Sequence, residues 1–97
     1  MAARKLETEA LVQICRENDA TMVGVFGSAA RGEADAESDI DLLVRFSKPK
    51  SLLDLVRLER NLSAHLKRKV DLLTQDAISP YLRETIMQDL RILYEAA

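Results

Sequence analysis

The feature that most constrains the fold is a stretch in which two apolar runs flank a Gly-Ser turn and a pair of aspartates. The first run, residues 22–26, leads into Gly27 and Ser28, and the second directly follows Asp39 and Asp41. Short apolar runs bounded by turn residues are typical of buried strands. Because side chains alternate across a strand, aspartates two positions apart project from one face, about 7 Å apart. The stretch therefore predicts two buried strands with a polar site beside them.

The polar residues of this stretch favour a site for a metal–nucleotide complex. A strand that ends in Gly-Ser and leads into a helix directs backbone N–H groups toward an anion. Gly27 would let the backbone approach phosphates, and the Ser28 hydroxyl would bind them. Magnesium takes oxygen ligands, usually one or two carboxylates plus substrate phosphates. Asp39 and Asp41 supply such a pair, and Asp71, near the start of a later apolar run, is a candidate third ligand. Taken alone, Gly27 could be an ordinary turn residue, and Asp39 and Asp41 could be solvated carboxylates. The occurrence of the turn and the aspartate pair together favours a functional site.

Two metal ions held by three carboxylates suit transfer from a nucleoside triphosphate, because one activates an incoming hydroxyl and the other stabilises the leaving pyrophosphate. Arg31 has two interpretations, which the sequence leaves open. Its guanidinium contacts a phosphate or a carboxylate of the site, or it pairs with Glu33 or Asp35 and fixes the loop.

Composition limits the classes that remain. A chain of 97 residues is expected to form one domain, residues 1–97, with 47% apolar and 31% charged residues. Its net charge of −2 gives no support to direct binding of nucleic acid. Cys15 is the only cysteine, which excludes a disulfide framework and favours the reducing cytoplasm. Its position among apolar residues predicts that it lies in the core. No apolar run has the length of a signal peptide or a membrane span, so we expect a cytoplasmic protein without membrane contact.

The periodicity of apolar residues predicts alternating helices and strands. Helices are expected at 3–18, 52–67 and 80–88, a short helical turn at 28–31, and strands at 22–26, 39–46 and 70–74. Residues 90–94 are expected to form a last strand, the alternative being a continuation of the preceding helix. This order predicts an α/β or α+β domain in which helices flank a small mixed sheet.

These residues resemble a known signature. Gly27 and Ser28, ten further residues, and then Asp39-x-Asp41 resemble the motif of the nucleotidyltransferase superfamily that includes DNA polymerase beta. The fuller pattern, GSAARG, SDIDLLV, a later VDLL and a closing LY, resembles the small stand-alone branch called minimal nucleotidyltransferases. All three carboxylate positions of that motif are filled, by Asp39, Asp41 and Asp71, which favours an active enzyme.

The resemblance implies the nucleotidyltransferase fold and a magnesium-dependent transfer of AMP from ATP to a hydroxyl. In this branch the small protein is often an antitoxin that adenylylates a tyrosine of its partner, an all-helical HEPN ribonuclease toxin. The first helix or the helix at 52–66 is a candidate face for docking that partner or for a homodimer, although core packing explains most of its leucines. Two alternatives stay open: an antitoxin that acts by binding alone, and a transferase acting on a small molecule or an RNA end.

One short match points elsewhere. Arg60 and His65 reproduce the Arg-x4-His spacing associated with HEPN ribonucleases themselves. Because that fold is all helical and this chain has three strand-like runs, we expect the match to be a coincidence and His65 to lie on a helix surface.

Overall fold

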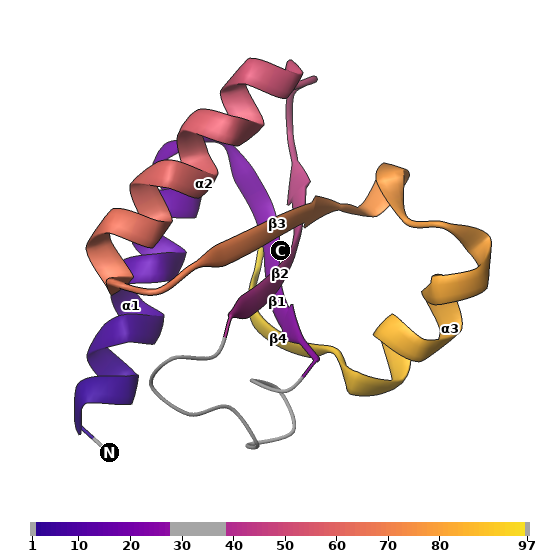
Figure 1. The fold of residues 1–97 in the computed structure, drawn as a ribbon. Coiled ribbons are helices and arrows are strands. Elements are labelled where there is room, and N and C mark those ends of the chain that lie inside the picture. The colour runs from indigo at the N-terminus through magenta and orange to yellow at the C-terminus, as the bar shows by residue number, and fades with distance from the viewer. Residues whose placement is uncertain (1, 28–38, 97) are drawn as a thin grey trace.

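The computed structural model describes residues 2–27 and 39–96 (Figure 1). These residues form three α-helices, four strands and one short 3-10 helix. In chain order the elements are α1 (Ala2–Glu17), β1 (Ala20–Phe26), β2 (Ile40–Phe46), α2 (Leu52–Leu66), β3 (Val70–Thr74), η1 (Gln75–Ala77), α3 (Pro80–Asp89) and β4 (Arg91–Glu95). Each helix and strand expected in these ranges is present, and residues 91–95 form a strand, so the helical alternative for this segment is wrong. The helical turn expected at 28–31 lies outside the described residues.

The strands form one mixed sheet in the order β3-β2-β1-β4. Strand β1 pairs antiparallel with β2 and with β4, whereas β2 and β3 run parallel. The parallel pair is joined by α2, the usual connection between parallel neighbours. This α+β arrangement confirms the predicted fold class and leaves β3 and β4 as the edges of the sheet.

Helices cover both faces of the sheet, as Figure 1 shows. Helices α1 and α2 lie on one face, and α3 lies on the other. The first face carries the larger core, whose fully buried side chains are Cys15, Val23, Leu42, Val44, Leu62 and Val70. The second core is smaller and consists of Met22, Leu43 and Ile86. Since Leu42 and Leu43 are both fully buried, β2 is a central strand covered on both sides, as its sequence predicts.

A bulge at the start of β1 shifts its side chains from one face to the other. Ala20 pairs with Phe46, but Met22 pairs with Arg45, so the register changes between Ala20 and Met22. Without that extra residue the two side chains would share a face. The bulge instead places Ala20 in the core beneath α1 and α2, and Met22 in the core beneath α3.

Helix α2 has a well-defined beginning and end. The Ser51 hydroxyl accepts the backbone N–H of Asp54, and the Asp54 carboxylate accepts that of Ser51, which together form a capping box. Lys67 adopts a left-handed conformation (φ 54°) that terminates the helix, one residue after its last helical position. Of its six leucines, Leu58, Leu62 and Leu66 are buried, so core packing explains half of them rather than most, whereas Leu52 and Leu53 are exposed.

Cys15 lies in the larger core and is inaccessible to solvent. Burial raises the pKa of its thiol to about 12, so the side chain stays neutral at physiological pH. Among the described residues, no helix has the length and apolar character needed to cross a membrane.

Candidate active site

Strand pairing brings two of the predicted carboxylates together. Asp41 of β2 and Asp71 of β3 are direct partners in the parallel register, which Ile40 and Val70 begin one residue earlier. Directly paired residues project from the same face, and here it is the face covered by α3, opposite the larger core. The two side chains therefore meet near the beginnings of their strands, although 30 positions separate them in the sequence.

Gly27 lies against this pair. Strand β1 ends at Phe26, whose partner in β2 is Asp41, and Gly27 follows with φ +73°. A Cβ atom at Gly27 would lie 2.5 Å from Oδ2 of Asp41, which is closer than any real contact. The backbone conformation therefore favours glycine, and any larger residue here would displace the Asp41 carboxylate.

Asp41 lies in a partly buried place close to other carboxylates, and its pKa reflects this. The pKa of Asp41 is raised, first because partial burial disfavours the charged form, and then because Asp71 and Asp39 add negative charge nearby. A hydrogen bond between the carboxyl groups of Asp41 and Asp71 raises it further, since one of the two must then carry a proton. A group of carboxylates that repel one another is suited to receive a cation.

The other predicted residues are placed less completely. Asp39 is exposed directly before β2 and close enough to Asp41 to raise its pKa. Ser28 and Arg31 lie outside the described residues, so their phosphate-binding roles stay predictions, as does the choice between the two interpretations of Arg31. His65 is exposed on α2, where its Nδ1 contacts the carbonyl oxygen of Asn61 (3.2 Å).

The donor set fits magnesium that arrives with a nucleotide. In residues 2–27 and 39–96, no three acidic, histidine or cysteine side chains are close enough to hold a metal ion by themselves. Magnesium seldom requires such a cage, because it binds through one or two carboxylates and completes its shell with phosphate oxygens and water. The Asp41–Asp71 pair supplies carboxylate oxygens of this kind, whereas the assignment of all three aspartates as ligands stays a prediction.

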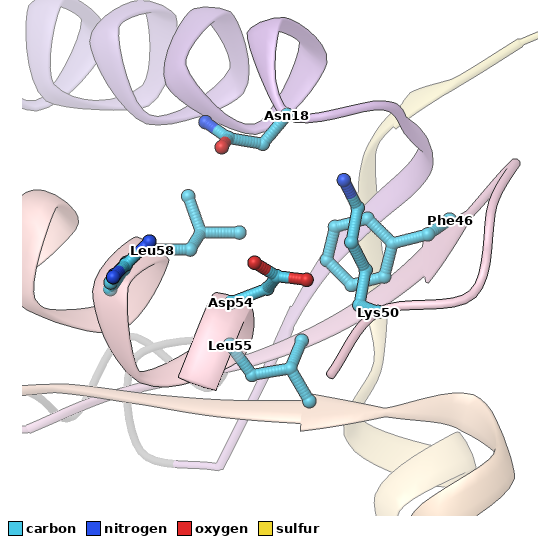
Figure 2. Close-up of a pocket in the computed structure, with 7 residues that line it drawn as sticks. Asn18, Phe46, Lys50, Asp54, Leu55 and Leu58 are labelled. Carbon is cyan, nitrogen blue, oxygen red and sulfur yellow. The ribbon is translucent and has the colours of Figure 1, made fainter. Parts of the chain in front are cut away.

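A hollow elsewhere on the molecule is separate from these carboxylates. It has a volume of about 190 Å³ and lies at the opposite end of β2, beside Phe46 and the beginning of α2 (Figure 2). The Lys50 ammonium within it pairs with Asp19 (Nζ–Oδ2 2.9 Å). Because ligand pockets usually measure about 300 to 1,000 Å³, and this cation already has a partner, the hollow is a poor candidate for the nucleotide.

Two side chains that sequence analysis did not single out contact the backbone on either side of Asp71. Glu59 and Ser63 of α2 accept hydrogen bonds from backbone N–H groups of β3, Glu59 from Leu72 (3.0 Å) and Ser63 from Val70 (3.1 Å). In the sequence both look like ordinary polar positions of an amphipathic helix. Their role becomes visible only when the helix and the strand are placed together.

Comparisons with known proteins agree with this geometry. The family profile described as nucleotidyltransferase domain matches residues 8–93. A candidate protein adenylyltransferase of Methanocaldococcus jannaschii, MJ0435, is 42% identical over 79 residues, which cover 81% of this chain and 85% of that protein.

Solved structures show the same fold. A candidate minimal nucleotidyltransferase superposes with a TM-score of 0.78 at 39% identity, over 90% of this chain and 89% of that chain. A complex of a tri-AMPylated HEPN toxin with its MNT antitoxin, from Shewanella oneidensis, gives a TM-score of 0.78 at 20% identity, over 95% and 72% of the two chains. With a profile that spans most of its length and a relative of this similarity, the chain belongs to the nucleotidyltransferase domain family.

Proposed function

We propose that this nucleotidyltransferase transfers AMP from ATP to a tyrosine hydroxyl of a HEPN-type toxin and thereby acts as an antitoxin in the cytoplasm. The observation that carries the proposal is the in-register pair of Asp41 and Asp71, with Gly27 against it. The protein adenylyltransferase name of its Methanocaldococcus relative and the AMPylated toxin bound to the Shewanella antitoxin support the choice of acceptor.

In this mechanism the three carboxylates have different roles. Asp39 and Asp41 would hold the magnesium that accompanies the triphosphate, and Asp71 would lie beside the acceptor hydroxyl. The phenolic oxygen attacks the α-phosphorus, a new phosphorus–oxygen bond forms, and the bond between the α- and β-phosphates breaks to release pyrophosphate. The phenolic proton passes to a carboxylate oxygen of Asp71 and then to solvent. Magnesium, when bound, lowers the pKa of the attacking hydroxyl and neutralises charge on the departing phosphates.

Gly27 and the segment after it serve the phosphates. Because Gly27 has no side chain, the backbone can approach both the triphosphate and the Asp41 carboxylate. Ser28 and Arg31 remain the proposed phosphate ligands, the first through its hydroxyl and neighbouring N–H groups and the second through its guanidinium.

The proposal is tested by intact-mass analysis of an all-helical candidate partner incubated with this protein, magnesium and each nucleoside triphosphate in turn. The expected result is the addition of AMP units from ATP, with the modified residue mapped to a tyrosine. Asp39→Asn should abolish the addition, and Glu84→Gln, at an exposed position of α3, is the matched control that should not.

The other outcomes identify the competing functions. A stable complex without any mass change, equally formed by the Asp39→Asn variant, would favour an antitoxin that acts by binding alone. Consumption of ATP with AMP added to a small molecule or an RNA end would favour the third alternative. Either result would contradict protein adenylylation.

A further inference from the structure

Strand β3 carries Asp71 but lies at an edge of the sheet. Within residues 2–27 and 39–96, its ladder of backbone hydrogen bonds joins it to β2 on one side only. An edge strand leaves a row of unpaired backbone groups on its outer side, and its position is correspondingly less constrained than that of a central strand. A catalytic carboxylate on such a strand needs support from another part of the molecule.

Helix α2 supplies this support through two side chains one helical turn apart. The backbone N–H of Val70 donates to Oγ of Ser63 (3.1 Å), and that of Leu72 donates to Oε2 of Glu59 (3.0 Å). Both donors belong to the residues that flank Asp71. Successive residues of a strand direct their N–H groups to opposite sides, so these two point away from β2 while that of Asp71 points toward it.

The spacing of the two elements matches. Residues 59 and 63 are about 6 Å apart along a helix, and residues 70 and 72 are about 6.6 Å apart along a strand. The helix and the strand run in opposite directions across the short connection at 67–69, so the pairs 63 with 70 and 59 with 72 fall opposite one another. The connection is itself fixed, because the carbonyl oxygen of Ser63 accepts the N–H groups of Lys67 and Arg68.

The two bonds differ in what they contribute. Ser63 is next to the connection, where the chain is already held by its own backbone. Glu59 contacts the strand beyond Asp71, at a point that the connection does not constrain, and both ends of its hydrogen bond are partly buried. A charged acceptor in a partly buried place makes a stronger hydrogen bond than a neutral one.

We propose that Glu59 is a positioning residue of the active site, whose carboxylate holds strand β3 at Leu72 so that Asp71 stays beside Asp41. The inference rests on the proposed function, because it assigns Asp71 a role in the transfer. Supporting residues of this kind typically change metal affinity or activity by about 10- to 100-fold when they are replaced.

The test uses two replacements of similar length with a matched control. Glu59→Met removes the acceptor and keeps a good helix-forming residue, whereas Glu59→Gln retains an acceptor oxygen without the charge. Glu84→Met makes the same change at an exposed position of α3, outside both candidate docking helices. For each variant, exchange of the Leu72 amide hydrogen is followed by NMR, and kcat and the magnesium concentration at half-maximal rate are measured with the partner protein.

In Glu59→Met we expect faster exchange at Leu72, a kcat lower by about 10- to 100-fold and a higher magnesium requirement. Glu59→Gln should restore all three quantities toward wild type, and Glu84→Met should change none. Faster exchange with unchanged kcat and magnesium dependence would show that the bond only stabilises the fold, and unchanged exchange would show that it does not hold the strand; either result would overturn the proposal.

If the proposed function itself is wrong, a different result is expected. In that case Asp71→Asn would retain wild-type transfer, or wild type would transfer nothing, whatever happens at Leu72. Because amide exchange is measured without nucleotide or partner, the mechanical part of the inference is tested separately from the chemistry.

Discussion

Replacing Gly27 by alanine should lower kcat by about 100-fold while the protein stays folded. Two separate effects arise at this position. Its φ of +73° is a left-handed conformation, which costs alanine about 1 to 2 kcal/mol. For a domain of this size each kcal/mol lowers Tm by about 4–8 °C, so the variant is expected to remain folded at moderate assay temperatures.

The second effect acts on the site. The new Cβ would lie 2.5 Å from Oδ2 of Asp41, whereas ordinary contacts begin at 3.4 Å. The Asp41 carboxylate must therefore retreat by about 1 Å, and a misplacement of this size in a catalytic group costs about 100-fold in rate. We expect kcat to fall by about that factor, with a smaller change in the unfolding midpoint.

Two further variants separate the effects in the same assays, which are the rate of AMP transfer and thermal unfolding. Gly27→Asn tolerates the left-handed backbone better, so stability should partly recover while activity stays low, because its Cβ meets the same carboxylate. Gly24→Ala is the control for losing a buried glycine: its Cβ would lie 2.6 Å from a methyl of Leu90, which costs stability away from the carboxylates. Wild-type kcat in Gly27→Ala, or an equal loss of kcat in Gly24→Ala, would refute the reasoning.

Two substitutions and one labelling experiment test the electrostatics, the burial of Cys15 and the helix cap. Asp41→Asn should abolish transfer yet raise Tm at neutral pH. Burial and Asp71 raise the pKa of Asp41 above its unfolded value, so the wild type loses stability as pH rises through the folded pKa. The melting temperatures of the two proteins should therefore converge below about pH 4. Cys15, whose pKa is raised to about 12, should resist iodoacetamide at pH 8 until the protein is unfolded, as mass spectrometry would detect; rapid labelling of the native protein would contradict its burial. Ser51→Ala should cost about 1 kcal/mol in chemical denaturation, because the Asp54 N–H loses its acceptor, and stability equal to wild type would contradict the cap. The pKa of Asp54 is held low first by the backbone N–H of Ser51 and then by its hydroxyl; the variant removes only the hydroxyl, so carboxyl-carbon NMR should show that pKa rising only part of the way to its usual value.

Much of the fold follows from local pattern. The apolar runs at 22–26 and 70–74 and the helical periodicity at 52–67 each predict the element that is observed, because burial patterns act within a few residues. The bulge at the start of β1 could not be predicted in this way. It depends on how β1 pairs with β2, and only that pairing places Ala20 and Met22 on opposite faces.

The site shows the same division. The spacing of Asp39 and Asp41 places both near one another, since a strand alternates with a period of two. Asp71 could be proposed only as a nearby third carboxylate, because its register against Asp41 depends on the length of α2 and the connection that follows it. Glu59 carried no signal, since a glutamate on a helix is ordinary until a strand edge is found beside it.

The most direct measurement of the central claim uses ATP labelled on either the α- or the γ-phosphate, with wild type and the Asp71→Asn variant, in the presence of magnesium and the partner protein. Transfer of AMP at the paired carboxylates places the α-label on the partner and releases the γ-label as pyrophosphate, and Asp71→Asn should show neither. Gamma-label on the partner, or α-label transferred equally by Asp71→Asn, would contradict adenylyl transfer at this site.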